Sequence, residues 1–230
     1  MIRWCAAVVL TVTLGACVQV LGIKDAERDP LRAKPASESA ATNPAAAVCK
    51  NYCNLVMDAC QGKLQQYATP EVCLAVCNMF DKGEPGAMSG NTANCRLTKV
   101  TAVKNSGEVA DLATCAAAGP GGNGTCGSEC EAYCALLQKA CSADFHDFAN
   151  DLAGCQTKCK AFPVVGVFEQ SIRGGDSLEC RLYHVTSAVL DAIHCGHAIG
   201  ASICVKGGDE NTGAGGSGAG GGGAGGAGGK

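Results

Sequence analysis

Two short stretches, Cys49-Lys50-Asn51-Tyr52-Cys53 and Cys130-Glu131-Ala132-Tyr133-Cys134, decide the fold because they open two copies of one pattern. In each copy another cysteine follows seven residues later, then a Cys-x3-Cys pair, a Cys-Arg-Leu run and two final cysteines. A repeat of this length indicates one structural unit used twice. The cysteines are Cys49, Cys53, Cys60, Cys73, Cys77, Cys95, Cys115 and Cys126 in the first copy, and Cys130, Cys134, Cys141, Cys155, Cys159, Cys180, Cys195 and Cys204 in the second.

The spacing within each copy is typical of helices. A Cys-x3-Cys pair puts both sulfurs on one face of a helix, one turn apart. Thr69-Pro70-Glu71 combines a capping hydroxyl, a proline suited to the first helical position and an acid near the positive helix end. A third helix is expected to begin near Cys95 and near Cys180, the latter with an apolar side that continues to Ile193. The prediction is an all-α fold of two tandem disulfide-rich helical units, with about three helices each.

Helix geometry also predicts half of the disulfides. Two antiparallel helices that each carry Cys-x3-Cys bring the first cysteine beside the last and the second beside the third. The expected hairpin bridges are Cys49–Cys77, Cys53–Cys73, Cys130–Cys159 and Cys134–Cys155.

The other four cysteines of each unit can pair in three ways. The assignment we prefer from the sequence is Cys60–Cys95, Cys115–Cys126, Cys141–Cys180 and Cys195–Cys204. A unit of this size gains little margin from its core alone, and bridges worth about 2–4 kcal/mol each offset that shortfall.

Composition limits the class of protein. The chain has 230 residues, 18 cysteines and a formal charge of −3. No Cys-x-x-Cys occurs, so zinc ribbons and thioredoxin-like redox sites lack their usual spacing. No basic stripe is present to neutralise phosphates, so nucleic acid is not an expected partner. The cysteine content is typical of an oxidising compartment, and no cofactor is expected.

The N-terminus supports an exported protein. Arg3 precedes an apolar stretch of about eleven residues that has the length of a signal h-region. The stretch ends in Leu14-Gly15-Ala16-Cys17, which resembles a bacterial lipobox. That resemblance implies cleavage before Cys17 and a diacylglycerol, with further acylation such as palmitate, on this residue. Parity agrees, because removing Cys5 with the signal and Cys17 with the lipid leaves an even sixteen cysteines.

The chain divides into five expected segments. The tether is rich in Ala and Pro without apolar periodicity, and the tail has 14 glycines in 24 residues, so both are expected to be disordered. The segments are residues 1–16 for the signal peptide, 17–47 for the lipid-anchored tether, 48–126 for the first cysteine-rich unit, 127–206 for the second, and 207–230 for the Gly-rich tail. Because residues 127–129 alone separate the last cysteine of one unit from the first of the next, the units are expected to contact each other.

Three histidines are the candidate metal ligands. His194-Cys195-x-His197 is a local metal-like pattern, and His184 could approach from the third helix. The first unit has no histidine at the equivalent positions, which are Lys99, Thr114 and Ala117. Surface or loop histidines are the competing interpretation, and the one favoured by the sequence.

A hydrolase is a weaker alternative. His184, Ser187 and Asp191 fall at i, i+3 and i+7 of one predicted helix, but one helix face rarely brings a nucleophile, a base and an orienting acid into mutual reach. No catalytic residue is assigned, and an enzyme is not expected.

Several motifs together resemble the cysteine-rich lipoproteins of myxobacteria and their relatives. They are the lipobox, Leu21-Gly22-Ile23-Lys24-Asp25-Ala26, Cys180-Arg181-Leu182-Tyr183-His184 and His194-Cys195-x-His197-Ala198. The resemblance implies a lipid-anchored protein of the cell envelope, in the outer membrane of a Gram-negative bacterium, and carries over no functional residue. The expected function is display of a helical module with a structural or binding role toward an envelope protein or glycan. Metal binding through His184, His194 and His197 is the alternative.

Overall fold

The structure is a computed structural model that describes residues 44–107, 109–149 and 151–209. The described residues all belong to one compact body. Their regular structure is helical, and within these ranges no strand forms beyond an isolated bridge between Asp81 and Thr92. The prediction of an all-α fold is therefore confirmed. The predicted signal peptide, Cys17, the tether up to residue 43 and the tail beyond residue 209 lie outside the described residues.

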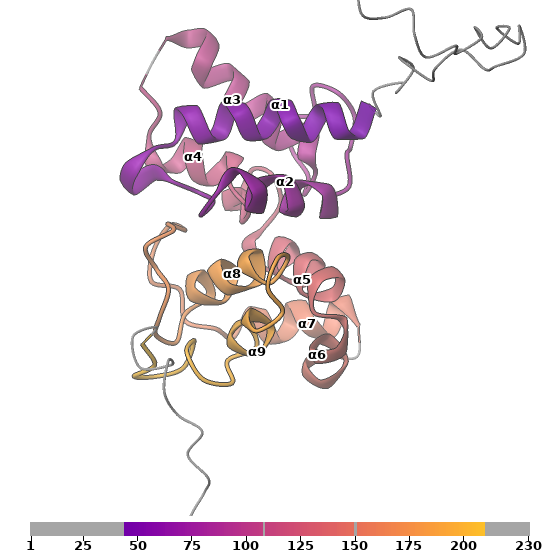
Figure 1. The fold of residues 1–230 in the computed structure, drawn as a ribbon, viewed down its shortest axis with the longest axis vertical. Coiled ribbons are helices and arrows are strands. Elements are labelled where there is room, and N and C mark those ends of the chain that lie inside the picture. Colours follow the sequence, from indigo (N-terminus) through magenta and orange to yellow (C-terminus); the bar gives the residue numbers. More distant parts are fainter. Residues whose placement is uncertain (1–43, 108, 150, 210–230) are drawn as a thin grey trace, which may run out of the picture. The chain divides into compact units, whose positions relative to one another are not determined.

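The first unit contains four α-helices in its described part (Figure 1). The long helices α1 and α3 pack against each other, α2 packs on α1, and α4 packs on α3. Short 3-10 turns cover 62–64 and 122–124. The helices are α1 (Pro44–Ala59), α2 (Pro70–Met79), α3 (Ala93–Ser106) and α4 (Leu112–Ala118).

The second unit contains five α-helices in its described part (Figure 1). They are α5 (Glu129–Ala140), α6 (Ser142–Phe148), α7 (Leu152–Cys159), α8 (Leu178–Ser187) and α9 (His194–Ala198). By their cysteines, α5, α7, α8 and α9 correspond to α1, α2, α3 and α4. The expectation of about three helices per unit was too low, because α4, α6 and α9 are too short for an apolar period to mark them.

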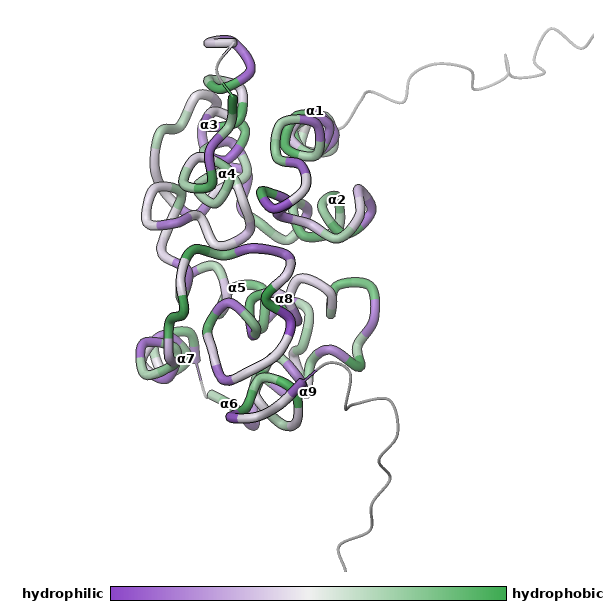
Figure 2. Tube along the Cα trace, turned by 90° about the vertical axis from the view of Figure 1, so that its left-hand side faces the viewer, coloured by the Kyte–Doolittle hydropathy of each residue, from purple (hydrophilic) through white to green (hydrophobic). Residues whose placement is uncertain are grey.

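Side-chain caps fix where the main helices begin. Thr69 accepts a hydrogen bond from the backbone N–H of Val72 and so starts α2 at Pro70, as the sequence predicts. Ser128 and Glu131 form a capping box at the start of α5, with bonds of 3.2 and 2.7 Å. Thr92 caps α3, and Ser177, its counterpart in the second unit, caps α8. Figure 2 shows apolar and polar residues interspersed along the helices.

The structure contains the four hairpin bridges that the Cys-x3-Cys spacing predicts. They are Cys49–Cys77 and Cys53–Cys73 in the first unit, and Cys130–Cys159 and Cys134–Cys155 in the second. Each pair joins the first helix of its unit to the helix that returns beside it.

The other four bridges differ from the preferred assignment. The expected pairs Cys60–Cys95, Cys115–Cys126, Cys141–Cys180 and Cys195–Cys204 are replaced by Cys60–Cys115, Cys95–Cys126, Cys141–Cys195 and Cys180–Cys204. The two units nevertheless agree with each other in every pairing.

Helix direction explains this correction. Asp58, near the end of α1, forms an ion pair of 2.5 Å with Lys104, near the end of α3. Cys95 lies nine residues before Lys104, which is about 14 Å back along the helix at 1.5 Å per residue. Cys60, directly beyond the end of α1, therefore lies at the wrong end of α3 to reach Cys95. About three helices were expected per unit and α4 was not among them, so the expected pairing did not include the contact by which α4 brings Cys115 to Cys60.

The repeated aromatic and arginine residues hold equivalent positions in both units. Tyr52 Oη donates to the Ala118 carbonyl at 2.5 Å, and Tyr133 Oη donates to the Ala198 carbonyl at 3.0 Å. The Arg96 guanidinium lies 3.9 Å from the centroid of the Phe80 ring, and the Arg181 guanidinium 4.0 Å from that of Phe162. The motifs that reveal the repeat in the sequence are thus parts of the frame, with cation–π and hydrogen-bond contacts in a buried setting.

The two units contact each other within this compact body, as the short linker predicts. The side-chain amide of Gln170 donates to the Gln66 carbonyl at 3.0 Å, and the Gln170 backbone N–H donates to the Gln65 carbonyl at 3.3 Å. One apolar cluster runs through buried side chains of both units, including Tyr52 and Tyr133. Among the described residues, no helix is long and apolar enough to cross a bilayer.

Candidate functional site

The cysteines of the described chain are all taken up in bridges, so they supply no thiolate. Sixteen cysteines form eight disulfides, and a disulfide sulfur neither titrates nor acts as a nucleophile or a thiolate ligand. Any chemistry in this region therefore depends on other side chains. Three histidines of the second unit form a cluster.

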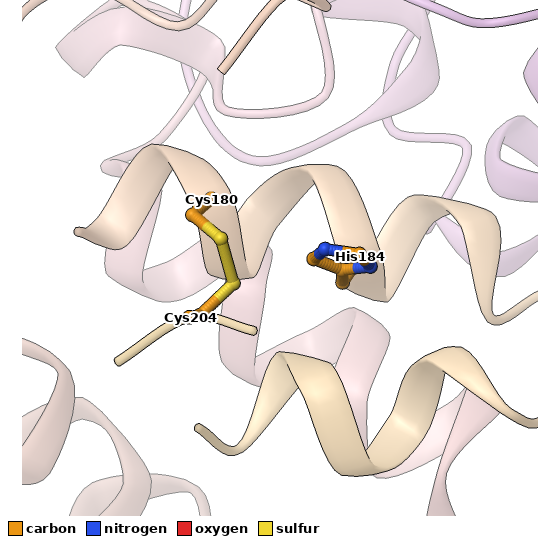
Figure 3. A group of neighbouring side chains, drawn as sticks. All are labelled: Cys180, His184 and Cys204. Carbon is orange, nitrogen blue, oxygen red and sulfur yellow. A yellow bond between two sulfur atoms is a disulfide. The ribbon is translucent and has the colours of Figure 1, made fainter. Parts of the chain in front are cut away.

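Helices α8 and α9 place the three candidate histidines. His184 lies one turn after Cys180 on α8, whose Cys180–Cys204 bridge fixes the C-terminal segment beside it (Figure 3). His194 and His197 are the first and fourth residues of α9, so they share one side of that short helix. The bridge between Cys141 and Cys195 anchors α9 to the end of α5.

The three rings meet in one place. His184 Nδ1 lies 2.9 Å from His194 Nδ1, within hydrogen-bonding distance. One ring nitrogen from each of His184, His194 and His197 lies within 4.8 Å of the others. His184 is fully buried, and the other two are partly buried. The sequence-based preference for surface or loop histidines is therefore wrong for His184, which is buried on α8, whereas His194 and His197 stay partly exposed on α9.

One hydrogen bond assigns the protonation of His184. Its Nε2 lies 3.0 Å from the backbone carbonyl of Arg173, and a carbonyl oxygen can only accept. Nε2 must then carry the hydrogen, which leaves Nδ1 with its lone pair directed at His194. Burial lowers the pKa of His184 to about 4. The hydrogen bond to the Arg173 carbonyl opposes this shift, and the nearby histidines and the Arg173 charge add to it. The ring is neutral at physiological pH.

The fourth histidine of the second unit and the other two residues of the hydrolase alternative do not join the trio. His146 is exposed on α6 and is absent from the cluster. Ser187 Oγ donates to the Tyr183 carbonyl at 3.1 Å, and Asp191 Oδ1 accepts the backbone N–H of Ile193 at 3.2 Å. Ser187 and Asp191 therefore make separate local hydrogen bonds, and they do not form a hydrogen-bonded relay with His184.

A second pair of ionisable residues, the buried Glu179 and the partly buried Glu129, was not predicted from the sequence. Glu179 is fully buried on α8, where Oε1 accepts the backbone N–H groups of Val165 and Gly166, both at 3.0 Å. Burial, with the charge of Glu179, raises the pKa of Glu129 to about 7. In the sequence both are ordinary acids at a helix start, and no spacing signal connects residues fifty positions apart.

The fold and its bridges define a class of protein, a disulfide-rich helical module built from two copies of an eight-cysteine unit. Residues 17–129 of the chain match the model of the BfoA family C-terminal domain. The match spans the first eight-cysteine unit and the segment before it, and it ends at the first residue of α5. No curated protein and no solved structure matches the chain. The family match therefore covers the first cysteine-rich unit, and the histidine cluster in the second unit lies outside the matched residues.

Proposed function

We propose that the protein is a cell-envelope lipoprotein that displays a rigid helical module for a structural or binding role and is not an enzyme. The observation that carries the proposal is the bracing by disulfides. Eight bridges brace the two units, and a frame of this kind is typical of an oxidising compartment. The bridges give the module the same shape whether or not a partner is bound, which suits display more than induced closure around a substrate.

The anchor is the second part of the proposal. Leu14-Gly15-Ala16-Cys17 resembles a lipobox, and the family match begins at Cys17, the residue that would become the lipidated N-terminus. Two or more acyl chains make a stable membrane anchor, with about 0.8 kcal/mol for each buried CH₂ group. The outer membrane of a Gram-negative bacterium is the proposed location, and an envelope protein or glycan is the proposed partner.

Metabolic labelling tests the anchor. The full chain is expressed in a Gram-negative host with an alkyne analogue of palmitate, and the labelled protein is followed into the membrane fractions. Label is expected on the wild-type chain in the outer-membrane fraction. Cys17→Ser is expected to lose the label and to remain at the size of the uncut precursor. The matched control is Cys5→Ser, which changes a cysteine within the proposed signal peptide and should keep both label and cleavage. Label that survives Cys17→Ser would overturn the anchor.

Thiol counting tests the display module separately. The mature protein is denatured and alkylated without reduction, and its mass is measured. The eight bridges predict no alkylated cysteine among residues 49–204, whereas alkylation after reduction should add sixteen groups. Free thiols in the non-reduced protein would contradict a module braced for the oxidising side of a membrane.

A further inference from the structure

We propose that His184, His194 and His197 form a binding site for a transition-metal ion of the Zn²⁺, Cu²⁺ or Ni²⁺ class, with a coordination position left open to water or a small ligand. The site goes beyond the display role and does not depend on it. It would hold equally in a protein without a lipid anchor.

The distances suit this ion class. Zn²⁺ binds imidazole nitrogens at about 2.0–2.1 Å, so ligand nitrogens around a tetrahedral ion lie about 3.3 Å apart. The closest pair here, His184 Nδ1 and His194 Nδ1, is 2.9 Å apart, and the whole set lies within 4.8 Å. Ring rotations that move nitrogens by no more than about 1.5 Å convert this arrangement into a coordinating one. The metal would take the place of the hydrogen that His194 Nδ1 donates to His184 Nδ1, and His194 would then carry its hydrogen on Nε2.

The outer contacts of His184 are those of a metal ligand. A metal-bound histidine usually donates its second ring N–H to a carbonyl or carboxylate, which fixes both tautomer and ring orientation. His184 makes this bond through Nε2 to the Arg173 carbonyl, and its Nδ1 faces His194 Nδ1. The ligand atom is therefore already deprotonated and aimed before an ion arrives.

The composition of the cluster selects the ion. The cluster is three imidazoles without a carboxylate among its members. Neutral nitrogen ligands favour Zn²⁺, Cu²⁺ and Ni²⁺, whereas Ca²⁺ and Mg²⁺ require oxygen ligands. A second group, Cys180, His184 and Cys204, also lies within 4.8 Å, but its two sulfurs are bonded to each other. Figure 3 shows this bridge beside His184, where it acts as a brace and not as a thiolate pair.

The duplication shows that the fold does not need the histidines. The first unit has the same bridge from α1 to α4 and the same tyrosine bond to the last residue of α4. Its equivalents of the three histidines are Lys99, Thr114 and Ala117, which share no ligand chemistry. One copy of the frame therefore forms without any of the three imidazoles, so their convergence in the other copy is not a requirement of packing.

Equilibrium dialysis of the tag-free full chain, with its bridges intact and after removal of metal by a chelator, tests the site. The probes are Zn²⁺, Cu²⁺ and Ni²⁺, with Ca²⁺ and Mg²⁺ as comparison ions, and Co²⁺ reports coordination by its visible absorption. The expected result is one Zn²⁺ per chain, no retained Ca²⁺ or Mg²⁺, and a Co²⁺ spectrum of a four- or five-coordinate nitrogen site.

Two variants and one control decide the ligands. His197→Ala and His194→Ala are on the partly buried α9, and each is expected to weaken Zn²⁺ binding roughly 100-fold or more, since loss of an outer partner alone costs up to that much. His146→Ala, on exposed α6, should bind as the wild type does. Circular dichroism on the same samples confirms that each variant is folded. Unchanged stoichiometry in folded His194→Ala and His197→Ala, or no retention of any of the three transition metals at 100-µM ion, would overturn the proposal.

Discussion

At the scale of single residues, the buried arginines explain why Cys-Arg-Leu occurs in both units. Arg96 is fully buried and donates to the carbonyls of Thr92, Gly119 and Pro120 and to the Asn91 side chain. These bonds connect the start of α3 to the end of α4 through a planar, permanently charged group. Arg181 takes the same place in the second unit, with an ion pair of 2.9 Å to Asp176.

Arg96→Met is therefore expected to destabilise the protein by about 3 kcal/mol or more. The substitution keeps the apolar contact with the Phe80 ring but leaves the buried carbonyls of Gly119 and Pro120 without the donor that Arg96 supplies. Guanidinium unfolding without reductant measures the loss. The control is Lys104→Ala, which removes an exposed ion pair with Asp58 and should cost less than about 1 kcal/mol. Similar losses for the two variants would contradict a framework role for Arg96.

Glu129 predicts a pH dependence of stability. Its pKa in the folded protein is raised to about 7 by burial and by Glu179, whereas an unfolded glutamate titrates near 4.5. The folded state therefore binds the proton more tightly, and stability falls as pH rises from about 4.5 through 7. The positive N-terminal end of α5 favours the charged carboxylate of Glu129, so it opposes the rise in this pKa by less than about 1 kcal/mol. Glu129→Gln should match the wild type at pH 4.5 and exceed its unfolding free energy by about 2 kcal/mol at pH 8, after discounting for partial exposure. If the unfolding free energies of the wild type and Glu129→Gln changed with pH in the same way, this prediction would be wrong.

Arg173 has two opposite effects at the histidine cluster. Its carbonyl orients His184, while its positive charge lies close enough to disfavour a further charge on that ring. Arg173→Gln keeps the carbonyl and removes the charge, so Zn²⁺ is expected to bind about threefold more tightly. Lys160→Gln makes the same change of charge at an exposed position and should leave the affinity unchanged. Competition with a chromophoric chelator measures both. Weaker binding by Arg173→Gln would show that its side chain supports the site.

At the scale of elements, the sequence predicts helices that are long or capped and fails for short ones. Thr69-Pro70 marks α2, and the cysteine faces mark α1 and α5, because several turns of periodicity or a local cap are visible. The predicted apolar side of α8 continues to Ile193, yet α8 ends at Ser187 and Ile193 is 65% exposed. Helix α9, with five residues, has too few turns to show a period. The observed pairings of the four cysteines outside the hairpin bridges of each unit depend on α4 and α9, so the sequence did not predict them. The sequence named the three histidines as candidate ligands, but their convergence also depends on α9 and could only be confirmed by the structure.

The corrected bridges have a test that reads connectivity and stability together. Replacing both Cys60 and Cys115 by Ser should leave no free thiol, since the pair Cys95–Cys126 remains closed. Under the assignment preferred from sequence, the same double variant would expose two thiols. The bridge closes a loop of 55 residues, so its loss is expected to cost about 4 kcal/mol, against about 3 kcal/mol for Cys53–Cys73, which closes 20. Thiol titration and guanidinium unfolding measure the two quantities.

At the scale of the whole molecule, the duplication separates what the frame needs from what one copy adds. Both units share the bridges, the buried tyrosine bond and the arginine over an aromatic ring. They differ in the segment before the third helix, which is longer in the second unit and supplies the Arg173 carbonyl. The first unit can therefore reproduce the three ligands but not the bond that orients His184.

This difference predicts the outcome of a transplant. In the full chain, Lys99→His, Thr114→His and Ala117→His together are expected to raise the stoichiometry from one Zn²⁺ to two, because α3 and α4 hold these positions as α8 and α9 hold the histidines. The new site should be about 10- to 100-fold weaker, since no equivalent of the Arg173 carbonyl orients the ring at position 99. Isothermal titration resolves two such sites, and adding His197→Ala should remove the tighter one alone. A transplant that folds and still binds a single Zn²⁺ would show that the third-helix and fourth-helix frames are not equivalent as metal scaffolds.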